Sequence, residues 1–401
     1  MTDKKKQSVR SIILLAAAGS LLYAVSAGIR QNYGVLMTAI AENSGVSFAT
    51  VSFIVAVGKL VFGVGQPAFG AVALKKSNRF VMVAGSILAM IGLIMIPFCK
   101  GVLPLLLFLG IILPAGTGAL SFGTIMGALT PLLAPAAAAA VSGIVSGSSG
   151  LGNIVLSPVL QSILEKSGLR NAVMFLVILA AVLIPISVLI TSRKPIRDIT
   201  AAESAADGSI FAMIGDALKN RNFVFLTFGF FTCGFHMGIV EMHYYNVVVN
   251  YGFSEQTAAF ALSIFGVTSI LSSLWSGALC SRIKMKNVLS LIYGIRAVLI
   301  PVFIFILPKT AAVMYIVGGL LGLIGTGTIP PTSGLTEKFF GPAKLALLFG
   351  FCFMVNQIGA FISVWAGGVI VSATGSYDII WLVSMVLCAA ASVICGKIRE
   401  D

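Results

Sequence analysis

Long apolar runs recur from one end of this 401-residue chain to the other, and they limit its fold more than any other feature. A helix needs about 20 apolar residues to cross the roughly 30 Å of bilayer hydrocarbon. Only 10% of the residues are charged, whereas a soluble domain has about 25%. The sequence therefore predicts an all-α membrane protein with twelve transmembrane helices, near residues 11–38, 47–74, 79–99, 101–128, 137–164, 170–192, 221–250, 255–281, 286–307, 311–336, 343–372 and 376–397.

The second half of the chain repeats landmarks of the first half. Pro135 and Gly152 recur 207 positions later as Pro342 and Gly359. Such a duplication is typical of secondary transporters, in which two related bundles move about a shared central site. We predict two pseudo-symmetric six-helix bundles joined by a cytoplasmic linker, with boundaries at 1–192, 193–220 and 221–401.

The positive charges are distributed unevenly among the predicted loops. With an even number of spans, nineteen Lys and Arg side chains fall on the side of the termini, and only four fall on the other side: Lys100, Lys166, Arg170 and Lys309. The positive-inside rule then places both termini in the cytoplasm. We expect a protein of the cytoplasmic (inner) membrane, whose net charge of +13 is a topology signal and implies no nucleic-acid partner.

Motifs for catalysis or cofactor binding are missing from the sequence. It contains no Gly-Lys-Ser/Thr phosphate loop, so neither ATP-driven transport nor another nucleotide-dependent activity is expected. The six cysteines and two histidines show no metal-ligand spacing. We therefore expect no enzyme activity, no cofactor and no metal.

Four ionisable residues fall deep within the predicted spans: Arg30, Lys59, Glu241 and Arg296. A charge at that depth is costly unless it is paired or hydrated. Three cations and one acid leave about two positive charges without a partner, and an anionic substrate would supply negative charge. The repeat places Arg30 and Glu241 at nearly the same depth. We expect them to face each other across a cavity, either as a gate that the substrate opens or as a permanent ion pair between the bundles.

Arg30 is the predicted anchor for the anion, because a guanidinium matches a carboxylate with two parallel hydrogen bonds. Tyr33 is expected on the same helix face, three residues further along. Lys59 either adds positive potential to the cavity or lies along a helix groove. Arg296, in the ninth span, is expected to have a structural or electrostatic role.

Amide side chains complete the predicted substrate site: Gln66, Asn153, Asn356 and Gln357. Hydrogen bonds between helices would satisfy these groups equally well, so both interpretations stay open. For coupling or gating we predict Glu241 together with His236 or His243, all in the seventh span. Both residue types can bind a proton near neutral pH, and a packing role is the alternative for each histidine.

Several stretches are similar to one branch of the major facilitator superfamily, the bacterial monocarboxylate-porter-like proteins related to the oxalate/formate antiporters. They are residues 28–34, 65–70, 233–236, 294–297, 329–334, 340–342, 356–361 and 374–378. The resemblance implies a twelve-helix fold and transport of a small organic anion, driven by a proton or a counter-anion. Better-studied carriers have a substrate-binding Arg in helix 8, where this chain has Ser269, Ser272 and Ser273, so carboxylate recognition is expected to shift to Arg30.

These observations predict a secondary active transporter of a small organic anion, most simply a monocarboxylate, that acts as a monomer by alternating access. Proton symport and anion exchange both remain open. One alternative is proton-coupled efflux of drugs or metabolites, in which Glu241 would bind cations. An alternative of another class is a membrane sensor that binds a small anion without transporting it.

Overall fold

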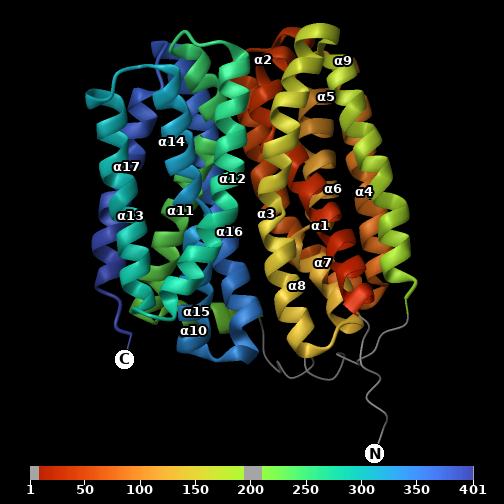
Figure 1. Ribbon diagram of the computed structural model, residues 1–401, viewed down its shortest axis with the longest axis vertical. Coiled ribbons are helices and arrows are strands. Elements are labelled where there is room, and N and C mark those ends of the chain that lie inside the picture. Colours follow the sequence, from red (N-terminus) through yellow and green to blue (C-terminus); the bar gives the residue numbers. More distant parts are fainter. Residues whose placement is uncertain (1–8, 194–209, 401) are drawn as a thin grey trace, which may run out of the picture.

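Two helical bundles lie side by side in the computed structural model, which describes residues 9–193 and 210–400 (Figure 1). The first bundle contains α1 (Val9–Gln31), α2 (Tyr33–Ser44), α3 (Phe48–Lys75), α4 (Asn78–Met95), η1 (Ile96–Phe98), α5 (Val102–Leu105), η2 (Leu106–Ile112), α6 (Leu113–Ala119), α7 (Phe122–Leu129), η3 (Thr130–Leu132), α8 (Pro135–Gly147) and α9 (Ser149–Thr191). The described residues contain no β-strand, so the all-helical prediction is confirmed for them.

The second bundle follows the predicted linker. It contains α10 (Ile210–Leu218), α11 (Arg221–Asn250), α12 (Glu255–Cys280), α13 (Met285–Pro301), η4 (Val302–Ile306), α14 (Ala311–Leu323), η5 (Thr326–Thr328), α15 (Ile329–Phe340), α16 (Pro342–Thr374) and α17 (Asp378–Gly396). Helix α1 begins and α17 ends at the same end of the molecule (Figure 1). The exact boundaries of the two bundles stay a prediction.

Eleven segments of the described chain are long and apolar enough to cross a bilayer. The longest, Val141–Thr191, covers most of the two runs expected near 137–164 and 170–192. Gly168 interrupts this segment with a φ of 74°, in the left-handed region that glycine tolerates, and α9 reverses direction at the upper end of the molecule (Figure 1). One segment thus stands where two were expected, and the count of twelve stays a prediction.

Four of the expected spans are interrupted, and one of them, the fourth, breaks at Leu120 and Ser121 between α6 and α7. The first breaks at Asn32, between α1 and α2, where the Asn32 side chain donates to the Gly28 carbonyl at 2.8 Å. The fifth breaks at Ser148, whose hydroxyl donates to the Val145 carbonyl at 2.7 Å. The tenth breaks at Gly325, between α14 and η5. At the breaks in the first and fifth spans, side-chain hydrogen bonds to nearby carbonyls accompany the interruption.

Glycines allow the central helices of each bundle to approach closely. Helix α1 packs on α9, and a Cβ on Gly152 would overlap the backbone of Gly28. Helix α11 packs on α16, and a Cβ on Gly359 would overlap the Phe231 carbonyl. Small residues at such contacts are typical of helix packing in membranes. The two contacts lie at corresponding positions of the repeat, because Gly152 and Gly359 are 207 positions apart.

The bundles contact each other through α3 with α16 and through α9 with α12. Hydrogen bonds join them at the end far from the termini. Gln161 of α9 donates to Glu255 of α12 at 2.5 Å and accepts from Tyr245 of α11. Gln256 of α12 donates to Glu165 of α9 at 3.2 Å. We call these five residues the distal latch: Gln161, Glu165, Tyr245, Glu255 and Gln256.

Candidate functional site

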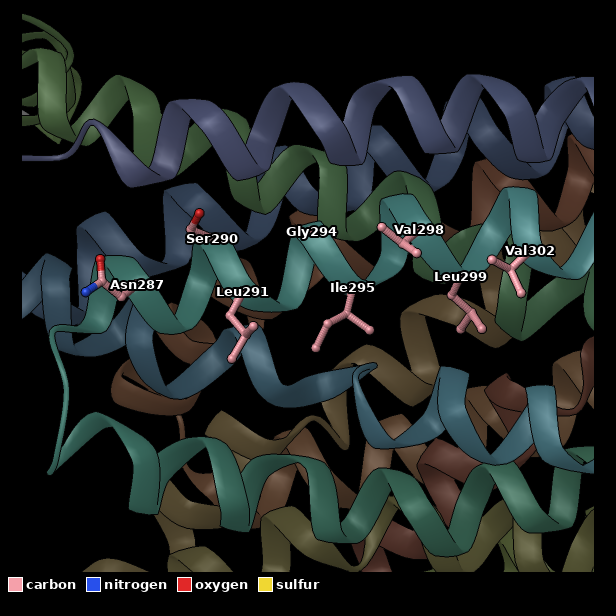
Figure 2. A pocket seen from close by; sticks show the side chains of 8 residues that line it. All are labelled: Asn287, Ser290, Leu291, Gly294, Ile295, Val298, Leu299 and Val302. Carbon is pink, nitrogen blue, oxygen red and sulfur yellow. The ribbon is translucent and has the colours of Figure 1, made fainter.

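A hollow with a volume of about 730 Å³ runs along the surface of α13. Its lining residues all belong to α13 and η4, and Leu291, Ile295 and Leu299 point to the same side of the helix (Figure 2). Val298 is 64% exposed. Exposed apolar surface of this kind is expected to contact lipid chains in a membrane protein. We therefore assign the groove to the bilayer.

A smaller cavity, of about 140 Å³, lies between the two bundles. Helices α1, α3, α8 and α9 line it from one side, and α11, α12, η5, α15 and α16 line it from the other. This lining includes residues at or next to two of the helix breaks, those at Ser148 and at Gly325. Its polar and charged members are Tyr23, Arg30, Gln31, Lys59, Ser146, Ser149, Cys233, Glu241, Ser269, Ser273, Thr326, Thr328, Asn356 and Gln357.

An ion pair crosses this cavity from one bundle to the other. The Lys59 amine of α3 lies 2.5 Å from the Glu241 carboxylate of α11, and the two side chains are 6% and 18% exposed. The expected pairing of Glu241 with Arg30 is wrong. Depth along the helices suggested that pair, but the partner is decided by helix rotation, which brings Lys59 to the carboxylate.

Arg30 lies in the last turn of α1, where the helix C-terminus favours a cation. Its guanidinium carbon is 3.7 Å from the centre of the Phe62 ring, a cation–π contact, and Tyr23 lies within electrostatic range. The ion pairs of the described residues are Lys59–Glu241 and the surface pair Lys219–Asp216. Within this part of the chain, Arg30 therefore has no carboxylate partner.

The described lining of the cavity has a net charge of one positive unit. Arg30 and Lys59 contribute two cations, and Glu241 contributes one anion. The lining also contains apolar and aromatic residues, among them Phe62, Phe230 and Phe353. Such surroundings strengthen electrostatic interactions relative to bulk water. The arrangement can attract one negative charge to the guanidinium of Arg30.

Two of the predicted amides lie in the cavity. Asn356 donates to the Phe230 carbonyl at 2.9 Å, and Gln357 donates to the Asn356 side-chain oxygen at 3.2 Å. These bonds fix the orientation of both amides on α16. They place two polar side chains of the second bundle in the same cavity as Arg30.

Two predicted substrate contacts lie outside the cavity lining. Tyr33 is buried, at 3% exposure, and is not part of the lining, although it lies within electrostatic range of Arg30. Gln66 is partly buried on α3 and does not reach the cavity either. For these two residues the substrate contact stays a prediction. The side chain of Asn153 lies outside the described residues.

Both histidines are fully buried inside the second bundle and do not line the cavity. His236 shares a hydrogen bond with the Ser384 hydroxyl at 3.0 Å, and His243 donates to the Val364 carbonyl at 2.8 Å. Their role in coupling stays a prediction. The described residues contain no group of three or more His, Cys, Asp or Glu side chains placed to hold a metal.

Arg296 of α13 is also fully buried, but it acts at a helix break. It donates to the carbonyls of Ile324 and Gly325, each at 2.6 Å. These carbonyls lie between the end of α14 and the start of η5. The arginine therefore stabilises the interrupted tenth span, and the neighbouring Gly325 and Thr326 line the cavity.

Sequence reasoning missed the aromatic residues around the cations. Tyr23 precedes Arg30 by seven positions, and Phe62 follows Lys59 by three. Both spacings place the pair on one helix face. This periodicity indicated aromatic rings near the cations, but it paired Phe62 with Lys59, whereas the Phe62 ring contacts Arg30 of α1.

Helices of membrane-crossing length, arranged as two bundles around a central polar cavity, define a membrane transport protein of the two-bundle type. The family model described as "Major Facilitator Superfamily" matches residues 19–315 and 244–399. The chain belongs to the Major Facilitator Superfamily, a family of transporters.

Known relatives and solved structures agree with this membership. The chain is 28% identical over 254 residues to the uncharacterized MFS-type transporter YcxA of Bacillus subtilis, a match covering 62% of this chain and 61% of that protein. It is 21% identical to monocarboxylate transporter 13 of Rattus norvegicus, covering 91% and 83%. The D-xylose-proton symporter has the same fold, with a TM-score of 0.73, 14% identity and coverage of 98% and 99%. A bacterial homolog of the human lysosomal transporter Spinster, in an inward-facing and unoccupied conformation, matches with a TM-score of 0.74, 15% identity and coverage of 98% and 97%.

Proposed function

We propose that this protein is a secondary active transporter of a small organic anion, most simply a monocarboxylate. The observation that carries the proposal is Arg30, a cation that lines the cavity between the bundles with no carboxylate partner among the described residues. A membrane protein stabilises such a charge with water or with an anionic ligand. Relatives named monocarboxylate transporters, at 21% to 24% identity over most of the chain, support the same substrate class.

In this proposal Arg30 binds the carboxylate through two parallel hydrogen bonds. Lys59 is held in its ion pair with Glu241, and Asn356 and Gln357 orient the substrate from the other bundle. Because groups from both bundles contact the substrate, rocking of one bundle against the other exposes it to each side of the membrane in turn.

Glu241 is the proposed coupling group. It is the carboxylate in the described lining, so a co-transported proton entering the cavity meets it there. Protonation would weaken its bond to Lys59 and release a contact between the bundles. Exchange against a second anion would use the same cavity without this step. Uptake driven by a pH gradient, compared with uptake driven by a preloaded carboxylate, separates the two mechanisms.

The test is uptake of radiolabelled pyruvate and lactate by proteoliposomes containing the Arg30→Gln variant. Loss of two charge-assisted hydrogen bonds is expected to reduce uptake roughly a hundredfold. Arg193→Gln is the matched control, because Arg193 is exposed at the end of the first bundle, away from the cavity. Undiminished uptake by a folded Arg30→Gln variant would contradict the proposal.

Competition experiments separate this function from its alternatives. Inhibition by lipophilic cations, without inhibition by carboxylates, would indicate efflux of drugs or metabolites. Binding of carboxylates without accumulation inside vesicles would indicate a sensor.

A further inference from the structure

We propose that Glu241 sets the charge of the substrate at one negative unit. The inference rests on the proposed function, since it concerns which anions the same cavity accepts. By pairing with Lys59, Glu241 leaves Arg30 as the single available cation of the described lining. A monocarboxylate then neutralises the cavity, whereas a dicarboxylate brings one negative charge too many.

The geometry of the pair supports this role. The Lys59 amine and the Glu241 carboxylate are 2.5 Å apart, and only 6% of the lysine side chain is exposed. A charge so deeply buried is costly unless a group of opposite charge lies beside it. Glu241 supplies that group from the opposite bundle, so the second cation of the cavity is already occupied before any substrate enters.

A dicarboxylate bound to Arg30 would place its second carboxylate in a cavity of about 140 Å³ that already contains Glu241. Like charges at such short range repel each other. To reach Lys59, the second carboxylate would have to displace Glu241 and leave that charge unpaired inside the protein. Both routes are unfavourable, and their cost gives the cavity its preference for monocarboxylates over dicarboxylates.

Replacing Glu241 with Gln removes the charge and keeps nearly the same side-chain shape. Lys59 then becomes available to a second carboxylate. We expect the affinity of the Glu241→Gln variant for dicarboxylates to rise by on the order of tenfold or more, the effect of one added charge-assisted hydrogen bond.

The experiment is a thermal-shift titration of the purified full-length protein in detergent, since a ligand that binds the folded state raises the melting temperature. Pyruvate and lactate are the monocarboxylate probes, and malonate and succinate are the dicarboxylate probes. The titrations are performed at neutral pH, where both carboxyl groups of malonate and succinate are ionised. Wild-type protein should respond to the first pair of probes, and Glu241→Gln should respond to the second pair as well.

The double variant Lys59→Met/Glu241→Gln is the matched control, because it removes both members of the pair. It should lose the dicarboxylate response gained by Glu241→Gln. As an independent measurement, Lys59→Gln alone leaves Glu241 facing Arg30 and should weaken pyruvate binding by on the order of tenfold.

The outcomes distinguish the inference from the proposed function. If wild-type protein binds pyruvate while neither Glu241→Gln gains dicarboxylate binding nor Lys59→Gln loses pyruvate binding, the assignment of charge selection to Glu241 is overturned. If wild-type protein binds neither class of probe, the proposed function itself fails.

Discussion

Single glycines decide how closely the helices behind the cavity can approach. Gly152 faces the backbone of Gly28, so even one added methyl group has no room between α9 and α1. Arg30 lies two residues beyond Gly28 on the same helix. A change in this contact therefore moves the predicted anion anchor as well as the packing.

We predict that Gly152→Ala destabilises the protein by about 1–3 kcal/mol, the usual cost of overpacking a well-packed contact. Gly143→Ala in α8 is the matched control, because a Cβ there meets no atom within 4 Å. The melting temperature in detergent is the measurement. Equal melting temperatures for the two variants would show that the α1–α9 contact tolerates a side chain.

For single residues, hydropathy predicted which charged side chains lie inside the membrane but not which groups they pair with. Arg30, Lys59 and Glu241 all line the cavity, and a charge within an apolar run was the signal that found them. The partner of Glu241 depends on helix rotation, which the length of a run does not specify. Tyr33 shows the same limit, because it lies beyond the break at Asn32 and outside the cavity lining.

Among the elements, two interrupted spans contribute residues at their breaks to the cavity lining. Ser146, Gly147 and Ser149 surround the break between α8 and α9, and Gly325 and Thr326 mark the break after α14. Non-helical backbone at membrane depth is tolerated where it lines a cavity. The apolar runs predicted continuous spans, because small and hydroxyl residues occur both in intact helices and at breaks.

The distal latch is a candidate for the gate that closes the end of the cavity far from the termini. Gln161 of α9 contacts Tyr245 of α11 and Glu255 of α12, so its side chain connects one helix of the first bundle with two helices of the second. Gln161→Leu removes these hydrogen bonds. We expect the population in which this end is open to increase several-fold, since the lost bonds favour the closed arrangement.

Spin labels on α2 and α12, at Thr38 and Thr257, would measure that opening as a distance distribution. Asn171→Leu is the control, because Asn171 lies on the same helix but donates only to the Ser167 carbonyl of its own bundle, among the bonds described. An unchanged distribution in Gln161→Leu would mean that the latch does not hold this end closed.

For the whole molecule, the duplication in the sequence was enough to predict two bundles around a central site. The number of separate spans was harder to predict from the sequence, because the fifth and sixth runs form one helical segment that turns at Gly168. No length of apolar sequence distinguishes a tight helical reversal from a longer loop. The side of the membrane on which each end lies remains a prediction from the charge pattern.

That orientation can be tested with single cysteines on the exposed loops. Lys100→Cys should react with a membrane-impermeant maleimide in intact cells, and Lys284→Cys should react only after permeabilisation. Both lysines are exposed. The six native cysteines are buried or half-buried, so they give little background. The reverse labelling pattern would invert the proposed topology and place the termini outside the cytoplasm.

The buried guanidinium of Arg296 has a consequence for how mutants of this protein should be interpreted. Its two hydrogen bonds tether the backbone just before Thr326, so a scaffold helix braces the cavity wall from behind. Replacing Arg296 with a shorter side chain would remove these hydrogen bonds, deform the cavity wall and impair transport of any solute, charged or neutral. A transport defect in an Arg296 variant would therefore report on the shape of the binding chamber, even though the residue lost is a cation.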